Sequence, residues 1–255
     1  MRTSRLPLEA DLIPYVAGFP PGRRWLVLAP HPDDETLGMG ATLSLAVSRG
    51  VDVRLAIVTD GARQGVPAAR EAEAVAAVGE LGLPPPEFWR FADRTLAGSQ
   101  PRLLEAILAA VKKHLPETVF VTSPVELHPD HRALAVATQR AVRRTSLLGL
   151  RQRSPLSLAA YEVATPMLPN LLVAADESWE RKRRAVAAYA SQLDHNPYDR
   201  VAEALGVIRR LTLAGCQHAE AFHVLPAAVV ARRSATAWAA LMGSPLGVTR
   251  ARPVR

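Results

Sequence analysis

Short apolar runs alternate with longer segments of helical periodicity through the first half of the chain, and this alternation constrains the fold more than any other feature. The apolar runs lie at 25–29, 51–59, 87–92 and 118–122. The segments expected to be helical follow them at 36–48, 67–81, 101–114 and 133–142. Strands that alternate with helices of about 10–15 residues indicate βαβ units and a parallel sheet. We therefore predict an α/β chain with a Rossmann-like, three-layer fold and a mostly parallel sheet.

The pattern loosens beyond Arg151. Further strands are expected at 156–163, 171–175 and 220–225, and further helices at 179–191 and 199–214. The proline-containing segment 1–23 is predicted to be an irregular lead-in. The Arg-rich segment after Pro226 is predicted to be a partly disordered tail or to pack on a neighbouring chain. A chain of 255 residues can bury a sizeable core, and we expect one domain over 1–255 with its core at about 24–225.

The loop after the first predicted strand has the sequence Pro30-His31-Pro32-Asp33-Asp34-Glu35. Open α/β sheets bind ligands at the carboxyl ends of their strands, where this loop is expected to lie. Two prolines restrict the backbone around His31, and a rigid loop with one imidazole and several carboxylates could hold a metal. The simpler alternative is a polar turn that caps the next helix.

A second cluster, His128-Pro129-Asp130-His131, follows the predicted strand 118–122 and precedes a predicted helix. Two His/Asp clusters at the carboxyl ends of two strands can converge on one site, which favours a metal site over two unrelated turns. The single Cys216 excludes a cysteine-rich zinc site. Any metal would therefore be held by histidine and carboxylate ligands.

The net charge of +7 comes mostly from arginine, but the basic clusters are scattered and lack interleaved aromatic residues. We therefore predict solvated helix faces and no nucleic-acid binding. The N-terminus has no continuous apolar stretch typical of a signal peptide. No run reaches the roughly 18 apolar residues of a membrane-spanning helix. A cytoplasmic location is the default expectation.

The two motifs resemble those of the LmbE-like, or PIG-L, family of zinc-dependent N-acetylglucosaminyl de-N-acetylases. Weaker matches are Arg70-Glu71-Ala72-Glu73, Ala188 to Gln192 and Ala219 to Phe222, and the resemblance covers roughly 24–224. It implies a hydrolase that removes the acetyl group from an N-acetylglucosaminyl conjugate. One alternative is a metallo-amidase that cleaves a larger acyl group from a sugar–thiol conjugate. Another is a non-catalytic sugar-binding module, but the absence of Gly-x-Gly-x-x-Gly after the first strand argues against dinucleotide binding.

The resemblance implies that His31, Asp34 and His131 are the ligands of a catalytic metal whose fourth position is open to water. The metal would be Zn²⁺, with Fe²⁺ or another divalent transition metal as the alternative. The spacing alone also permits Asp33 to be the ligand and Asp34 the base.

The resemblance also assigns catalytic roles. Asp33 would be the general base that takes a proton from the metal-activated water. His128 would stabilise the oxyanion as an imidazolium, and Asp130 would hold that ring protonated and oriented.

Three further residues are expected at the substrate. Asp93 would accept hydrogen bonds from sugar hydroxyls, and Arg70 would face the active site with Glu73, the alternative being a surface ion pair. Glu126 stands where some members have a mobile tyrosine, and Leu127 stands where others have an arginine. Glu126 is therefore assigned to substrate binding. The substrate would be a small amino-sugar conjugate, and the family resemblance also allows a homo-oligomer.

Overall fold

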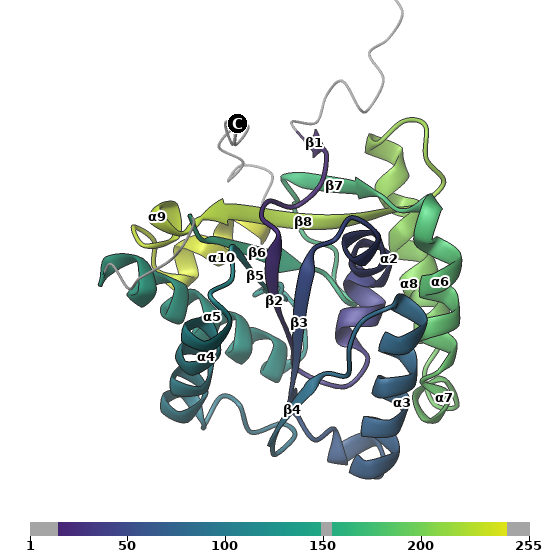
Figure 1. Ribbon diagram of the computed structural model, residues 1–255, viewed down its shortest axis with the longest axis horizontal. Coiled ribbons are helices and arrows are strands. Elements are labelled where there is room, and N and C mark those ends of the chain that lie inside the picture. The colour runs from purple at the N-terminus through teal and green to yellow at the C-terminus, as the bar shows by residue number, and fades with distance from the viewer. Residues whose placement is uncertain (1–14, 149–154, 244–255) are drawn as a thin grey trace, which may run out of the picture.

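The computed structural model describes residues 15–148 and 155–243, in which one eight-stranded sheet forms the centre (Figure 1). The strands are β1 (Val16–Ala17), β2 (Arg24–Ala29), β3 (Asp52–Thr59), β4 (Glu87–Phe91), β5 (Thr118–Thr122), β6 (Ser157–Tyr161), β7 (Leu171–Ala174) and β8 (Ala219–Pro226). Their order is β1-β7-β8-β6-β5-β2-β3-β4. Neighbouring strands are parallel except where β8 pairs with β6 and with β7. The predicted α/β fold with a mostly parallel sheet is confirmed.

Helices cover both faces of this sheet and produce three layers (Figure 1). One face packs against α2 (Asp34–Ser48), α3 (Pro67–Leu81), α6 (Asp176–Ala187) and α8 (Tyr198–Arg209), with the short α7 (Ala190–Leu193) beside them. The other face packs against α4 (Gln100–His114), α5 (Pro129–Leu147), α9 (Ala227–Val230) and α10 (Ala235–Gly243). Short 3₁₀ turns lie at Ala62–Gln64 and Arg210–Thr212. Within the described ranges, no helix combines the length and the apolar character needed to cross a bilayer.

Strand β2 shows why the sheet is covered on both sides. Trp25, Val27 and Ala29 belong to the core on the α2 side, whereas Leu26 and Leu28 belong to the core on the α5 side. Successive side chains of a strand point to opposite faces, so this division follows from the pleat. None of the five is more than 1% exposed, which explains why the strand is a continuous apolar run in the sequence.

Both ends of the described chain differ from expectation. The predicted irregular lead-in contains β1, which pairs in parallel with β7 at the edge of the sheet. After β8 the chain forms α9 and α10, and Trp238 and Met242 of α10 are buried in the core on the α5 side. The prediction of a disordered or neighbour-packed tail is therefore wrong for 227–243. Residues 1–14 and 244–255 lie outside the described part.

The fold brings the two His/Asp motifs to one edge of the sheet. Strands β2 and β5 are adjacent and parallel, so the loops after their carboxyl ends lie side by side. Helix α2 begins at Asp34, and α5 begins at Pro129 rather than at the predicted Ala133. Each motif therefore runs from a strand end into the first turn of a helix. The Thr59 hydroxyl donates to the carbonyl of Pro30 at 2.8 Å and fixes the first loop from the neighbouring strand.

Candidate metal centre

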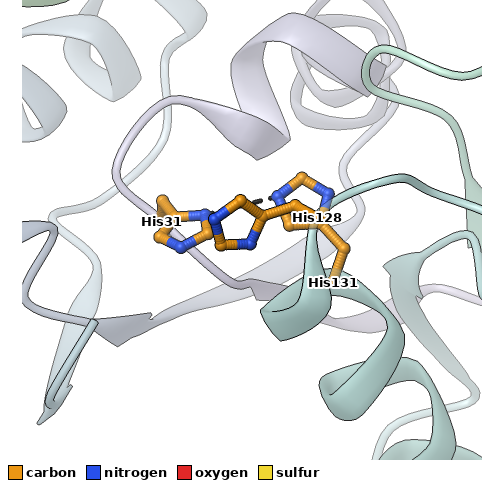
Figure 2. A group of neighbouring side chains, drawn as sticks. All are labelled: His31, His128 and His131. Atoms are coloured by element: carbon orange, nitrogen blue, oxygen red, sulfur yellow. Dashed lines mark hydrogen bonds between the residues drawn. The ribbon is translucent and has the colours of Figure 1, made fainter. Parts of the chain in front are cut away.

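Three donor atoms from the two motifs form a nearly equilateral triangle. The distance from Asp34 Oδ2 is 3.1 Å to His31 Nδ1 and 3.2 Å to His131 Nε2, and the two ring nitrogens are 3.3 Å apart. A tetrahedral zinc site with bonds of about 2.0–2.1 Å places its ligand atoms about 3.3–3.4 Å apart. The donor set therefore fits one divalent metal with a fourth position left open. Figure 2 shows the imidazoles of His31 and His131 facing one another.

The electrostatics of Asp34 match this geometry. Its Oδ2 also accepts a hydrogen bond from the backbone N–H of His31 at 2.9 Å, which ties the two predicted ligands of the first loop together. Burial would raise the pKa of the Asp34 carboxyl, but His131 and His31 outweigh burial and hold that pKa well below its usual value. Asp34 is therefore ionised, which is the state that metal binding would require.

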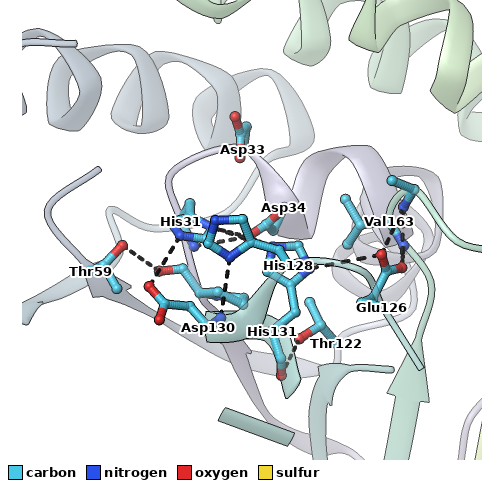
Figure 3. Close-up of polar contacts among 12 residues, drawn as sticks. His31, Asp33, Asp34, Thr59, Thr122, Glu126, His128, Asp130, His131 and Val163 are labelled. Carbon is cyan, nitrogen blue, oxygen red and sulfur yellow. Dashed lines mark hydrogen bonds and ion pairs between the residues drawn. The ribbon is translucent and has the colours of Figure 1, made fainter. Parts of the chain in front are cut away.

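Two carboxylates lie behind the imidazole of His31. His31 Nε2 is 3.3 Å from Asp93 Oδ1. It is 3.6 Å from Asp130 Oδ2, and Figure 3 shows Asp130 beside His31. Asp130 is held by the backbone N–H groups of Arg94 at 2.6 Å and Leu96 at 3.1 Å. Burial would raise the pKa of Asp93, but the hydrogen bond and charge of His31 lower it to about 2. Carboxylates in this position hold the ring proton of His31 on Nε2, the nitrogen that faces away from the donor triangle. They leave Nδ1, which faces the triangle, free for a metal.

This arrangement corrects the expected partners of Asp130 and Asp93. The Asp130 carboxylate was expected at the ring of His128, but it faces His31, and the contact to His128 Nδ1 comes from the backbone N–H of Asp130 at 3.2 Å. Asp93 was expected to face sugar hydroxyls, whereas one of its oxygens faces His31 and the other accepts from the backbone N–H of Arg63 at 3.1 Å.

His128 is the N-cap of α5, and its Nδ1 accepts that N–H of Asp130. A ring nitrogen that accepts carries no proton, so the ring is neutral and its proton is on Nε2. Burial and the neighbouring His31 and His131 also lower the pKa of His128, against the expected imidazolium. Its ring centroid is 4.5 Å from that of His31, so it belongs to the same site (Figure 2).

Glu126 is buried behind the other imidazole. Its carboxylate accepts hydrogen bonds from three successive backbone amides, those of Val163, Ala164 and Thr165, at 2.7–3.4 Å. Its Oε2 lies 4.0 Å from His131 Nδ1, a buried ring nitrogen without a hydrogen-bond partner among the described residues (Figure 3). Glu126 was expected to bind substrate, but both of its oxygens are engaged by the loop after β6.

Asp33 is held apart from its neighbour Asp34. Its φ of 135° is a backbone conformation that L residues rarely adopt, and this turns the side chain away from the donor triangle. The buried guanidinium of Arg70 donates to Asp33 Oδ2 at 3.1 Å and to the carbonyl of Pro32 at 2.5 Å. Burial and the charge of Asp34 raise the pKa of Asp33 well above its usual value, and Arg70 opposes that rise.

Arg70 thus contacts the first loop and lines the cavity, but it makes no ion pair with Glu73. Glu73 instead accepts from the backbone N–H and hydroxyl of Ser191, at 2.8 and 2.7 Å. Arg70 lines the cavity and Glu73 does not, and the alternative of a surface ion pair between the two is wrong.

A cavity of about 360 Å³ opens onto the donor triangle. Besides the residues expected at the site, its lining includes Gln64 of the loop after β3. It also includes Arg94, Val163 and Tyr198, which sequence reasoning missed. Tyr198 comes from α8, and no motif near it signals a function. A larger and mostly apolar hollow of about 1350 Å³ lies between α6 and α8, but none of the expected site residues lines it.

Other donor combinations are present in the described part of the chain. His31, His128 and His131 could share an ion, as could His31, Asp93 and Asp130. The first combination leaves out Asp34, whose oxygen lies closest to both ligand imidazoles. The combination with Asp93 and Asp130 would bind the ion through His31 Nε2, the nitrogen on which these carboxylates hold the proton of the neutral ring. The triangle with Asp34 therefore fits a single metal best.

Comparisons with known proteins agree with this site. The family model PIG-L, GlcNAc-PI de-N-acetylase, matches residues 26–142 and so includes both motifs. A probable N-acetyl-alpha-D-glucosaminyl L-malate deacetylase 2 of Bacillus cereus is 27% identical over 186 residues, 68% of this chain and 84% of that protein. A 1D-myo-inositol 2-acetamido-2-deoxy-alpha-D-glucopyranoside deacetylase of a Mycobacterium species is 34% identical over 173 residues. That match covers 54% of this chain and 53% of the mycobacterial protein, about half its length.

A solved structure supports the relationship over most of the chain. The conserved protein TT1542 from Thermus thermophilus superposes with a TM-score of 0.68 at 32% identity. The match covers 78% of this chain and 93% of that one. The relationship inferred from the two motifs is confirmed, and the chain belongs to the PIG-L family of GlcNAc-PI de-N-acetylases.

Proposed function

We propose that this chain is a metal-dependent hydrolase that removes the acetyl group from an N-acetylglucosaminyl conjugate. Its curated relatives are named as N-acetylglucosaminyl deacetylases. The observation that carries the proposal is the donor triangle, 3.1–3.3 Å on each side, which lines a cavity large enough for a sugar. Two imidazoles and one carboxylate with an open position are typical of catalytic rather than structural zinc.

His31, Asp34 and His131 would hold the metal. Zn²⁺ suits this ligand set best, and Fe²⁺ or another divalent transition metal is the alternative. When bound, such an ion polarises the acetyl carbonyl and lets water ionise near neutral pH. Asp93 and Asp130 keep the outer nitrogen of His31 protonated and fix the orientation of its ring.

Asp33 is the general base in this proposal. It takes a proton from the attacking water and returns it to the leaving amine. Its raised pKa makes the carboxylate a stronger base, and the N–H groups of Arg70 keep it aimed beside the metal ligands. His128, with its proton on Nε2, donates to the oxyanion that develops on the acetyl oxygen. A neutral imidazole can donate this hydrogen bond, so His128 need not be an imidazolium.

The direct test is acetate release from N-acetylglucosaminyl conjugates by the purified chain. We expect about one divalent metal per chain by elemental analysis. Chelation should abolish acetate release, and added Zn²⁺ should restore it. Acetate release that persists after complete removal of the metal would show that the hydrolysis takes another route.

The same assay separates the alternatives within this family. Preferential release of an acyl group larger than acetyl would identify a metallo-amidase instead of a deacetylase. Binding of the sugar conjugate with metal present but without any hydrolysis would identify a binding module.

A further inference from the structure

The mouth of the metal-site cavity carries two arginines with unneutralised charge. Arg94 lines that cavity, and Arg63 lines a neighbouring hollow of about 360 Å³; both residues are exposed. The two spaces share Gln64 in their linings, so they adjoin. Over residues 15–148 and 155–243, neither guanidinium has a hydrogen bond or an ion pair. Arg70 differs from them, because its guanidinium donates to the carbonyl of Pro32 and to Asp33.

The backbone at both arginines is anchored to the carboxylates behind His31. Asp130 accepts the N–H of Arg94 at 2.6 Å, and Asp93 accepts the N–H of Arg63 at 3.1 Å. Arg94 also has a φ of 63°, a left-handed conformation that residues other than glycine adopt rarely. Such strain is concentrated at functional sites, where the surrounding structure over-determines the backbone. The fold thus fixes where the Arg94 side chain leaves the backbone relative to the metal ligands.

The carboxylates that line this cavity cannot neutralise Arg94, because each is already engaged. Asp34 contacts the imidazoles of His31 and His131, and Asp93 contacts His31 and the backbone N–H of Arg63. Asp33 contacts Arg70, and Glu126 accepts from three amides. The neighbouring hollow is lined by Arg63, Gln64, Gly65, Gln192, His195 and Asn196, none of which is acidic. The mouth therefore favours a negative charge on whatever occupies it.

We propose that Arg94 binds an anionic group, a carboxylate or a phosphate, on the part of the substrate attached to the sugar, and that Arg63 assists it. This assignment rests on the proposed function: the acetyl group reaches the donor triangle, and the rest of the conjugate extends toward the mouth. The guanidinium fork binds carboxylate and phosphate oxygens in a bidentate manner, which a lysine cannot reproduce. Arg94 is thus a residue that determines substrate specificity.

The test compares matched conjugates with the full-length, zinc-loaded chain. One N-acetylglucosaminyl conjugate carries a hydroxy acid, the second carries the primary amide of that acid, and the third carries a phosphate in its place. We expect kcat/KM for an anionic conjugate to exceed that for the amide by about tenfold or more. Arg94→Gln should reduce this ratio toward one, mainly through KM, and Arg94→Lys should retain part of it.

Arg143→Gln is the matched control, because Arg143 is also an exposed arginine, lies on α5 and lines neither space. It should leave the ratio unchanged. Equal kcat/KM for charged and neutral conjugates, or a charge preference that survives Arg94→Gln, would overturn the assignment. A preference for phosphate over carboxylate, or the reverse, supports it and identifies the anion.

Calorimetric binding of the same three conjugates keeps this inference separate from the deacetylase proposal. If none releases acetate, the proposed function fails, and the affinities still decide whether Arg94 selects an anion. Equal affinities of the wild-type chain for the anionic conjugates and the amide would reject the Arg94 assignment even in an active enzyme.

Discussion

At the scale of single residues, the site depends on the different contacts and pKa values of two adjacent carboxylates, Asp33 and Asp34. Asp33 and Asp34 are neighbours in the sequence, yet Asp34 contacts the imidazoles of His31 and His131 and Asp33 contacts Arg70. The unusual φ of Asp33 separates their directions. Their pKa values move apart accordingly, down for Asp34 and up for Asp33. Environments that push two titratable groups apart in this way are typical of an acid–base pair with divided roles.

The pair Asp33→Asn and Asp34→Asn tests this division with one chemical change at adjacent positions. Asp33→Asn should keep the metal and lower kcat by about 10²–10⁴-fold, because it removes the proton acceptor. Asp34→Asn should lose metal affinity, because the carboxylate is replaced by a weak ligand. Metal content and acetate release are measured on both. The opposite pattern, with metal lost in Asp33→Asn and kept in Asp34→Asn, would mean that the two roles are exchanged.

Glu126 gives a second prediction at this scale. Glu126→Ala leaves the amides of Val163, Ala164 and Thr165 without their acceptor, and that of Val163 is buried. We expect the change to lower the free energy of unfolding by about 1–3 kcal/mol. It also removes the carboxylate behind His131 and should weaken metal binding roughly 10–100-fold. Urea denaturation and metal competition measure these effects. An increase in KM with unchanged metal affinity would instead support the substrate-binding role predicted from the sequence.

At the scale of elements, helix α2 is positioned by contacts that lie well away from the metal ligands. Met39 has non-helical backbone angles, and the helix kinks there. Beyond the kink, the buried carboxylate of Glu220 accepts the N–H groups of Ala41 and Thr42, and Lys182 pairs with it at 2.7 Å. This cap satisfies backbone donors that the kink would otherwise leave unpaired. Strand β8 and helix α6 therefore anchor the segment of α2 that follows the kink.

Two glycine-to-alanine changes test how closely α2 must approach the sheet. A Cβ on Gly38 would lie 2.4 Å from the carbonyl oxygen of Glu162 and 2.5 Å from the ring of Tyr161, so α2 would have to move. We expect Gly38→Ala to cost about 1–3 kcal/mol in unfolding free energy and to weaken metal binding.

Gly79→Ala is the control, since a Cβ on this residue of α3 meets nothing within 4 Å. It should raise the unfolding free energy by about 0.5–1 kcal/mol through helix propensity and leave metal affinity unchanged. Chemical denaturation and metal titration of both variants measure the difference. Equal metal affinity in the two variants would show that the approach of α2 to the sheet does not position Asp34.

At the scale of the whole molecule, the site joins parts of the chain that are distant in sequence. His31 follows β2, His131 follows β5, Tyr198 begins α8, and Glu126 is held by the loop after β6. A metal that binds only this folded arrangement stabilises it by mass action.

Metal addition should therefore raise the thermal unfolding midpoint of the metal-free chain. Once the metal concentration exceeds the dissociation constant, the midpoint should rise with the logarithm of that concentration. Scanning calorimetry at several Zn²⁺ concentrations measures this. The same additions should not shift the midpoint of Asp34→Asn. An equal shift in both proteins would place the bound metal elsewhere on the chain.

Some of this could be predicted from local pattern alone. The helix 67–81 and the strand 118–122 have the predicted bounds, because their periodicity and their flanking glycine or proline residues specify them locally. Both motifs lie at strand ends as predicted, because a strand followed by a helix in a parallel sheet has only one end at which such loops can lie. The antiparallel position of β8 between β6 and β7 was not predictable, since a strand's neighbours depend on the path of the whole chain.

The sequence by itself determined the fold class and the place of each motif at the end of a strand, because local periodicity specifies both, and the two motifs carried the resemblance to the family. The adjacency of β2 and β5, which brings the motifs together, belongs to the tertiary structure. Only the tertiary structure decided which partner each polar side chain has. Asp130 and Asp93 face His31, Glu126 meets the loop after β6, and the Arg94 guanidinium has no partner within the described ranges. The physical reason is that a polar contact depends on the direction of a side chain to within about an ångström, and elements distant in sequence set that direction.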